Sequence, residues 1–262
     1  MSFAPEWLAL REKADADARA EDLLDPLRET LLNRNPLLVR DVGCGTGSMG
    51  RWLARRLDGR QHWVLHDRDP RLLAVAGATV PGPGVTVETR EGDLTALRAE
   101  DLKGTSLLTA SALLDLLTAD EVDALAAACV DAGCPALLTL SVAGRVELDP
   151  PEPLDAEFAE AFNDHQRREV DGRRLLGPDA VAAAVDSFER RGAVVLARPS
   201  PWRLGPDQAA LAGEWLRGWV DAACEQRPAL AEEAPAYLAR RLAGGLRVVV
   251  GHVDLLALPR SA

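Results

Sequence analysis

The chain has 262 residues, of which 47% are hydrophobic and 27% charged, and its formal net charge is −11. This composition fits one α/β domain or one domain with a cap, and the acidic surface disfavours nucleic acids and anionic membranes as partners. The four cysteines form no C-x-x-C pair, and the sequence shows no basic-plus-apolar leader and no apolar run of membrane length. We therefore expect a cytoplasmic protein with reduced cysteines.

Short apolar runs alternate with helical patterns as far as residue 142. A helix is predicted over residues 6–32, interrupted near Pro26, because leucines recur there at helical spacing. Strands are then predicted at 37–41, 62–67, 85–88, 106–110 and 136–142, and helices at 49–57, 70–78 and 119–132. Strands separated by helices predict an α/β fold with a doubly wound, mostly parallel sheet, whose ligands bind at the carboxyl ends of the strands.

The alternation is interrupted twice after residue 142. Helical insertions are predicted at about 145–176 and about 203–244, and with the N-terminal helical segment 1–36 they are expected to cap the strand ends. The main domain is placed at residues 37–258. It is completed by one more helix and two strands, at 178–190, 193–197 and 246–256.

The strongest local signal is a glycine-rich loop between the first predicted strand and the next helix. It runs from Asp41 through Gly43, Cys44 and Gly45 to Gly47. Glycines let the backbone turn tightly and approach a ligand closely, and the free N–H groups at the start of the following helix suit a carboxylate or a phosphate.

Three other uses of this loop are disfavoured by the residues that follow it. A dinucleotide-binding loop would have its third glycine where Ser48 stands. A phosphate-binding P-loop would need a lysine after Gly47, and a hydrolase elbow around Ser48 would need a glycine at position 46.

Two acids follow the next two predicted strands. Asp67 ends the second strand, at about the 20-residue distance from the glycines at which a carboxylate accepts both ribose hydroxyls. Asp93 lies just past the third strand, where a carboxylate can accept a hydrogen bond from the exocyclic amine of adenine. Together with the loop, these acids predict a site for an adenine nucleoside.

At this point the chain resembles the class I S-adenosylmethionine-dependent methyltransferases, which have a Rossmann-like fold. The resemblance rests on Asp41–Gly47, Asp67 and the segment around Asp93. It implies that S-adenosylmethionine is the cofactor and S-adenosylhomocysteine the product. It further implies that the loop contacts the cofactor, that Asp67 binds the ribose, that Asp93 with Leu94 binds the adenine, and that Arg68 lines the adenine.

The resemblance covers residues 37 to about 142 and implies further contacts. Thr109–Asp115 is similar to the family's fourth motif, so Ser111 is expected beside the methionine part of the cofactor. Arg11 is expected either to pair with the methionine carboxylate or to lie on a solvated helix face. The family's sheet has seven strands with the last one antiparallel, and it joins its last two strands by a short turn, where this chain has a long insertion.

The acceptor side carries fewer signals. In-line displacement at an activated methyl group needs positioning and exclusion of water, so a base is optional, and oxygen or nitrogen acceptors are favoured over carbon. His165 is the preferred candidate base because it lies in the first insertion, although a polar helix face explains it equally well. The three tryptophans Trp202, Trp215 and Trp219 form either core or the wall of a pocket for a flat acceptor. Asp115 alone predicts no metal site.

Two other functions stay open at this point. An NAD-dependent oxidoreductase would use the same loop and ribose acid, and a catalytically inactive S-adenosylmethionine-binding protein would keep the same pocket. The expected partner is a small-molecule substrate, and the sequence leaves its identity and the oligomeric state open.

Overall fold

Strands and helices alternate along the first half of the chain, as the sequence predicts. The computed structural model describes residues 4–80, 82–93 and 97–260. Its helices are α1 (Pro5–Ala18), α2 (Leu24–Leu31), α3 (Ser48–Leu53), α4 (Pro70–Thr79), α5 (Ala119–Asp131), α6 (Asp155–Gln166), α7 (Ala180–Arg190), α8 (Ala209–Gln226) and α9 (Ala234–Leu242). Its strands are β1 (Leu37–Val42), β2 (Gln61–Asp67), β3 (Val85–Glu91), β4 (Leu107–Ser111), β5 (Ala136–Asp149), β6 (Glu169–Val170), β7 (Arg173–Arg174), β8 (Val194–Pro199), β9 (Trp202–Leu204) and β10 (Arg247–Leu258). No helix among these residues is both long enough and apolar enough to cross a membrane.

The main sheet has the strand order β3-β2-β1-β4-β5-β10-β8, and β9 pairs with β10 as an additional strand. β10 runs antiparallel to both of its neighbours, while β1 to β5 pair in parallel. The predicted sheet with an antiparallel last strand is therefore confirmed. The strand order reverses direction between β1 and β4, and ligands of doubly wound sheets bind outside the strand ends at such a point.

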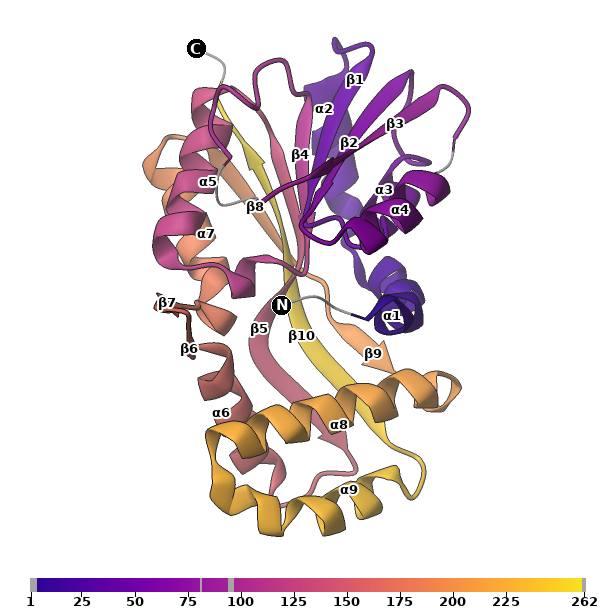
Figure 1. The fold of residues 1–262 in the computed structure, drawn as a ribbon, viewed down its shortest axis with the longest axis vertical. Coiled ribbons are helices and arrows are strands. Elements are labelled where there is room, and N and C mark those ends of the chain that lie inside the picture. Colours follow the sequence, from indigo (N-terminus) through magenta and orange to yellow (C-terminus); the bar gives the residue numbers. More distant parts are fainter. Residues whose placement is uncertain (1–3, 81, 94–96, 261–262) are drawn as a thin grey trace.

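Two hydrophobic cores lie on opposite faces of this sheet (Figure 1). α5 and α7 cover one face, where Leu125 and Phe188 are buried. α2, α3 and α4 cover the other face, with Leu27, Trp52 and Trp63 in its core. Neighbouring residues of a central strand contribute to different cores, as Leu107 and Leu108 of β4 do, because successive side chains of a strand point to opposite faces.

The N-terminal helix is interrupted earlier than the sequence predicts. α1 ends at Ala18, whereas Pro26 lies inside the first turn of α2, where proline is tolerated because its missing N–H has no helical partner. At the actual break, the N–H of Ala20 donates to Oδ2 of Asp254 at 2.9 Å. The break is thus stabilised by a residue far away in the sequence, on β10.

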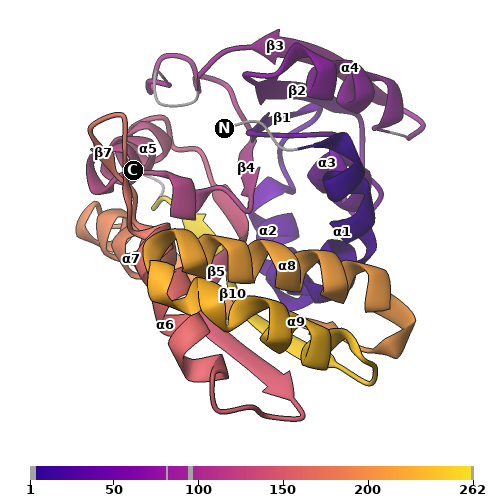
Figure 2. The ribbon, with the colours of Figure 1, turned by 60° about the horizontal axis from the view of Figure 1, so that its bottom comes forward.

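β5 and β10 continue well beyond the sheet as a long two-stranded ribbon, joined at its side by β9 (Figures 1 and 2). β5 extends to Asp149, so the residues where the first insertion was expected to begin are strand. A third core forms where α6 and α8 pack beside this ribbon, and it buries Phe158, Trp219 and Tyr237. Figure 2 shows α8 and α9 lying across the ribbon. The ribbon was missed because Arg145 and Glu147 give that stretch a polar appearance, although alternate residues face the third core.

Candidate cofactor and acceptor site

The glycine loop follows β1 in a backbone conformation that only glycine adopts easily. Gly43, Gly45 and Gly47 have φ angles of +64°, +54° and +86°, all in the left-handed region that costs other residues about 1–2 kcal/mol. The loop is also closely covered, since a Cβ on Gly45 would lie 3.3 Å from Cδ1 of Leu8 in α1. The glycines therefore serve both the turn and the close approach of α1.

Asp67, the last residue of β2, holds the loop in place. Its Oδ2 accepts a hydrogen bond from the N–H of Gly45 at 2.9 Å, and its Oδ1 accepts one from the N–H of Asp69 at 3.0 Å. A carboxylate offers about four acceptor positions, so Asp67 keeps capacity for a ligand while it fixes the loop.

Asp41 is buried at the end of β1. Its Oδ1 accepts from Oγ1 of Thr109 at 2.7 Å, whereas its Oδ2 has no hydrogen-bond partner among the described residues. Burial raises the pKa of Asp41 to about 7, although Thr109 and the nearby Arg19 guanidinium act in the opposite direction. Oδ2 of Asp41 is therefore an acceptor that is available to a cation or a hydrogen-bond donor of a ligand.

A cavity of about 210 Å³ opens above the loop. It brings together eight of the residues singled out from the sequence: Asp41, Gly43, Cys44, Gly45, Asp67, Arg68, Ser111 and Arg11. Its other walls come from α1 and from the β6–β7 hairpin, which contribute Leu8, Asp15, Val170, Asp171 and Arg173. The N-terminal helix and part of the first insertion thus both cover the strand ends.

Asp93 lies at the edge of this cavity. Its neighbour Gly92 lines the cavity, and Oδ2 of Asp93 lies 3.5 Å from Nη2 of Arg68, with both side chains about half exposed. Gly47 is not among the lining residues, and Leu94 falls outside the described residues.

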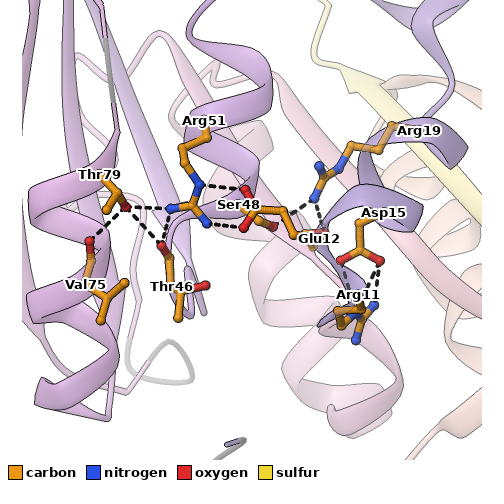
Figure 3. Close-up of polar contacts among 10 residues, drawn as sticks. Arg11, Glu12, Asp15, Arg19, Thr46, Ser48, Arg51, Val75 and Thr79 are labelled. Atoms are coloured by element: carbon orange, nitrogen blue, oxygen red, sulfur yellow. Dashed lines mark hydrogen bonds and ion pairs between the residues drawn. The ribbon is translucent and has the colours of Figure 1, made fainter. Parts of the chain in front are cut away.

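The N-terminal segment is joined to α3, the helix after the loop, by the contacts of Glu12 with Arg51 and of Arg19 with Ser48, whereas Arg11 and Asp15 pair within α1 (Figure 3). Glu12 accepts two hydrogen bonds from Arg51 of α3, and Arg11 forms an ion pair with Asp15. Arg19 donates from Nη2 to Oγ of Ser48 at 3.2 Å and to Oγ of Ser111 at 3.1 Å. Glu12 and Arg19 were not predicted from the sequence, because charged residues in an N-terminal helix are most often solvated.

Arg19 places a buried positive charge behind the cavity wall. Only 3% of the residue is exposed, and its Nε and Nη1 have no hydrogen-bond partner among the described residues. Its guanidinium lies over the ring of Trp52 at 5.4 Å. The charge is close to Asp41 and Asp254, both of which it favours in the ionised form.

Arg11 lies between this cavity and a second one, so it is not on a solvated helix face. Its side chain is 14% exposed, and its guanidinium stacks 4.9 Å from the ring centre of Trp202. The second cavity, also of about 210 Å³, shares Arg11, Ala112 and Leu116 with the first. The two cavities are therefore neighbours.

The three tryptophans of the second insertion divide between pocket wall and core. Trp202 and Trp215 line the second cavity, together with Trp7 of α1 and Phe162 of α6. Trp219 is 2% exposed and stacks on Trp215 with ring centres 5.6 Å apart, inside the third core. Two of the three thus have the position expected of a pocket wall.

His165 lines neither cavity, so the structure does not support its predicted role as a base. Its Nε2 lies 3.1 Å from Oε2 of Glu225 on α8, and burial together with Arg168 lowers its pKa. The histidine of the first cavity is His66, whose pKa is lowered to about 4 by burial and by Arg40. His66 is therefore neutral at pH 7 and a weak base.

Comparisons with known proteins give one family model that matches part of the chain and solved structures with a similar fold. Residues 39–133 match a family model described as a methyltransferase domain. Solved structures with a similar fold include the YcgJ protein of Bacillus subtilis, at 12% identity over 93% of this chain and 100% of that one, with a TM-score of 0.52. A proposed methyltransferase from Bacillus halodurans C-125 is similar at 16% identity over 90% and 99% of the two chains, with a TM-score of 0.50. The structure of an S-adenosylmethionine-dependent methyltransferase from Geobacter sulfurreducens in complex with S-adenosyl-L-homocysteine is 18% identical over 99% of this chain and 100% of that one, with a TM-score of 0.46. A search of curated proteins returned no match.

Proposed function

We propose that the chain is an S-adenosylmethionine-dependent methyltransferase of the class I fold and that it methylates an oxygen or nitrogen atom of a small molecule. The methyltransferase-domain model that matches residues 39–133 and the solved structures of similar fold support this proposal. The observation that carries the proposal is the pair of adjoining cavities. The first is lined by the glycine loop and Asp67, and the second shares Arg11, Ala112 and Leu116 with it. A donor in the first cavity would meet an acceptor in the second at these shared residues.

The residues of the first cavity suit the parts of S-adenosylmethionine. We assign the ribose hydroxyls to the spare acceptor positions of Asp67, and the adenine to Arg68 and the adjoining Asp93. The amino acid part falls to Asp41, whose unpartnered Oδ2 suits an ammonium group, and to Ser111 and Arg11. Arg19 supplies positive charge behind Ser111, on the side where a carboxylate would lie.

S-adenosylmethionine supplies a methyl group already activated by its sulfonium charge. The protein's task is then to hold the two reactants in line and to exclude water, and positioning of this kind contributes roughly 7–11 kcal/mol to a two-reactant step. α1 and the β6–β7 hairpin, which cover the first cavity, serve that exclusion. Segment 1–36 and the two insertions, at about 145–176 and 203–244, are accordingly proposed to act as caps on the domain.

The proposal is tested by incubating the protein with methyl-labelled S-adenosylmethionine and a small-molecule extract, followed by chromatography. We expect a labelled product in which the methyl group is bound to oxygen or nitrogen. Asp67→Ala should reduce the product strongly at a limiting concentration of S-adenosylmethionine, while Asp120→Ala, an exposed acid at the start of α5, should leave it unchanged. Binding of S-adenosylhomocysteine without any labelled product would instead favour a non-catalytic binding protein, and a labelled carbon would contradict the acceptor assignment.

A further inference from the structure

The second cavity has aromatic walls on several sides. Trp7 of α1, Phe162 of α6, Trp202 of β9 and Trp215 of α8 line it, together with aliphatic residues of β5 and β10. Its volume is about 210 Å³, compared with about 150 Å³ for a protein cavity that holds one benzene molecule. Aromatic walls favour flat apolar ligands because rings stack or meet edge to face. The space therefore fits a molecule of one or two rings.

The polar side chains that line this cavity include Arg145, Asn163 and His252 as well as the two acceptors Asp115 and Gln166. Gln166, the last residue of α6, has its Oε1 buried without a partner among the described residues. Asp115 lies in the short helical turn Leu114–Leu116 that follows β4. A buried acceptor without a partner is unfavourable, so a ligand that donates a hydrogen bond to it is favoured over one that does not.

Asp115 shares the cavity with charged or titratable groups of three other elements, Arg11 of α1, Arg145 of β5 and His252 of β10. Burial raises its pKa, while its own backbone N–H and the guanidiniums of Arg11 and Arg168 favour the charged form. Arg11 is itself paired with Asp15, and His252 in the same cavity is neutral, since burial lowers its pKa to about 3. Asp115 is therefore the carboxylate of this cavity, and it is a stronger base than an exposed aspartate.

We infer that the second cavity binds an acceptor of one or two flat rings that carries a hydroxyl or amine group, and that Asp115 and Gln166 recognise the O–H or N–H of that group. The inference rests on the proposed function, because it names the class of acceptor for the same transfer. It also explains the position of Asp115 one residue from Leu116 and three from Ala112, both of which line the two cavities in common.

The position gives Asp115 a chemical role in the transfer. The lone pair of the acceptor oxygen or nitrogen forms the new bond to the methyl carbon, and the electron pair of the breaking carbon–sulfur bond remains on sulfur. The proton of the acceptor group passes to the Asp115 carboxylate and from there to water. Charge balances, because a sulfonium cation and a carboxylate become a neutral thioether and a neutral acid.

Calorimetry with matched naphthalene derivatives tests this inference without requiring turnover. The probes are 2-naphthol, 2-naphthylamine and 2-methoxynaphthalene, titrated into protein with and without S-adenosylhomocysteine. We expect 2-naphthol, 2-naphthylamine or both to bind about tenfold more tightly than 2-methoxynaphthalene, which has the same rings without a donor. The stronger of the two donors identifies whether the site prefers oxygen or nitrogen.

Two substitutions assign the preference to the residues named. Asp115→Asn and Gln166→Met should each reduce the preference for the donor about three- to tenfold and leave 2-methoxynaphthalene unchanged. Asp120→Asn is the matched control, because it makes the same change on an exposed residue nearby. Equal binding of all three probes, no binding of any, or a preference that survives both substitutions would overturn the inference. S-adenosylhomocysteine binding in the same samples separates this outcome from failure of the proposed function.

Discussion

Arg51 holds Glu12 with two parallel hydrogen bonds, from Nε to Oε1 at 2.7 Å and from Nη2 to Oε2 at 2.6 Å. The same guanidinium donates to Oγ1 of Thr79 at 2.6 Å and to the carbonyl of Thr46 in the glycine loop. One side chain therefore joins α1, the loop and α4. Because α1 also covers the first cavity, this contact connects the N-terminal segment to cofactor binding.

Glu12→Gln should weaken binding of S-adenosylhomocysteine two- to fivefold. Glutamine keeps the size of the side chain but replaces a charged, bidentate contact, so α1 covers the cavity less firmly. The pair is partly exposed, at 19% and 33% of the two side chains, and we expect stability to fall by about 1 kcal/mol at most. Calorimetry gives the affinity, and Glu6→Gln, an exposed residue of the same helix, is the control. Equal affinities for Glu12→Gln and wild type would show that the contact between Glu12 and Arg51 plays no part in binding.

Gly45→Ala should destabilise the protein by about 1–2 kcal/mol, since a residue with a Cβ is forced into the left-handed region. The new Cβ would also lie 3.3 Å from Leu8, so α1 must shift slightly. Gly218→Ala makes the same substitution at an exposed position of α8, where the added Cβ meets no described atom within 4 Å. Alanine is the better helix former, so this control should gain up to about 1 kcal/mol. Urea unfolding measures both changes, and a stabilised Gly45→Ala protein would contradict the described loop.

Asp41 should make the stability of the protein depend on pH between about 4 and 7. In the folded state burial raises its pKa from the ordinary 3.8 to about 7. Between pH 4 and pH 7 Asp41 binds fewer protons in the unfolded chain than in the folded protein. The stabilising contribution of Asp41 to the unfolding free energy is therefore complete below about pH 4 and is lost as the pH rises through about 7. The loss amounts to about 4 kcal/mol at most, since one pKa unit corresponds to about 1.4 kcal/mol.

The effect is isolated by comparing wild type with Asp41→Asn, which does not titrate and can still accept from Thr109. The unfolding free energy of Asp41→Asn, relative to wild type, should rise steadily from pH 4 to pH 8. Parallel pH curves for the two proteins would mean that Asp41 titrates alike in both states. A matched Asp120→Asn protein should follow the wild-type curve.

The parts of this molecule that the sequence predicts well are those determined by neighbours in the chain. The loop Asp41–Gly47 and the acid Asp67 lie in one strand–loop–helix–strand unit, so their spacing alone brings them together. Arg19 and Gln166 reach the surroundings of the two cavities only through packing between distant segments, and no local pattern distinguishes them from ordinary charged or polar residues. Arg19, for example, reaches Ser111 across 92 positions of sequence.

His165 shows that the sequence does not predict which side chains of a polar helix face a cavity. Phe162, Asn163 and Gln166 of α6, in the first predicted insertion, line the second cavity, which we propose as the acceptor site. Successive residues of a helix point about 100° apart, so His165 is turned away from Gln166 and meets Glu225 on α8. Which face of a polar helix is covered depends on the ribbon of β5 and β10, and that ribbon was not predictable from its polar, alternating residues.

The most direct test of the whole account is calorimetric titration of S-adenosylhomocysteine into the wild-type protein and into Asp67→Ala, with Asp120→Ala as control. The account predicts one binding site in the wild type and in the control, and an affinity at least about tenfold lower in Asp67→Ala, because a charged acceptor for the ribose is lost. If the wild type gives neither heat nor a thermal shift, or if Asp67→Ala binds as tightly as the wild type, the first cavity is not the cofactor site.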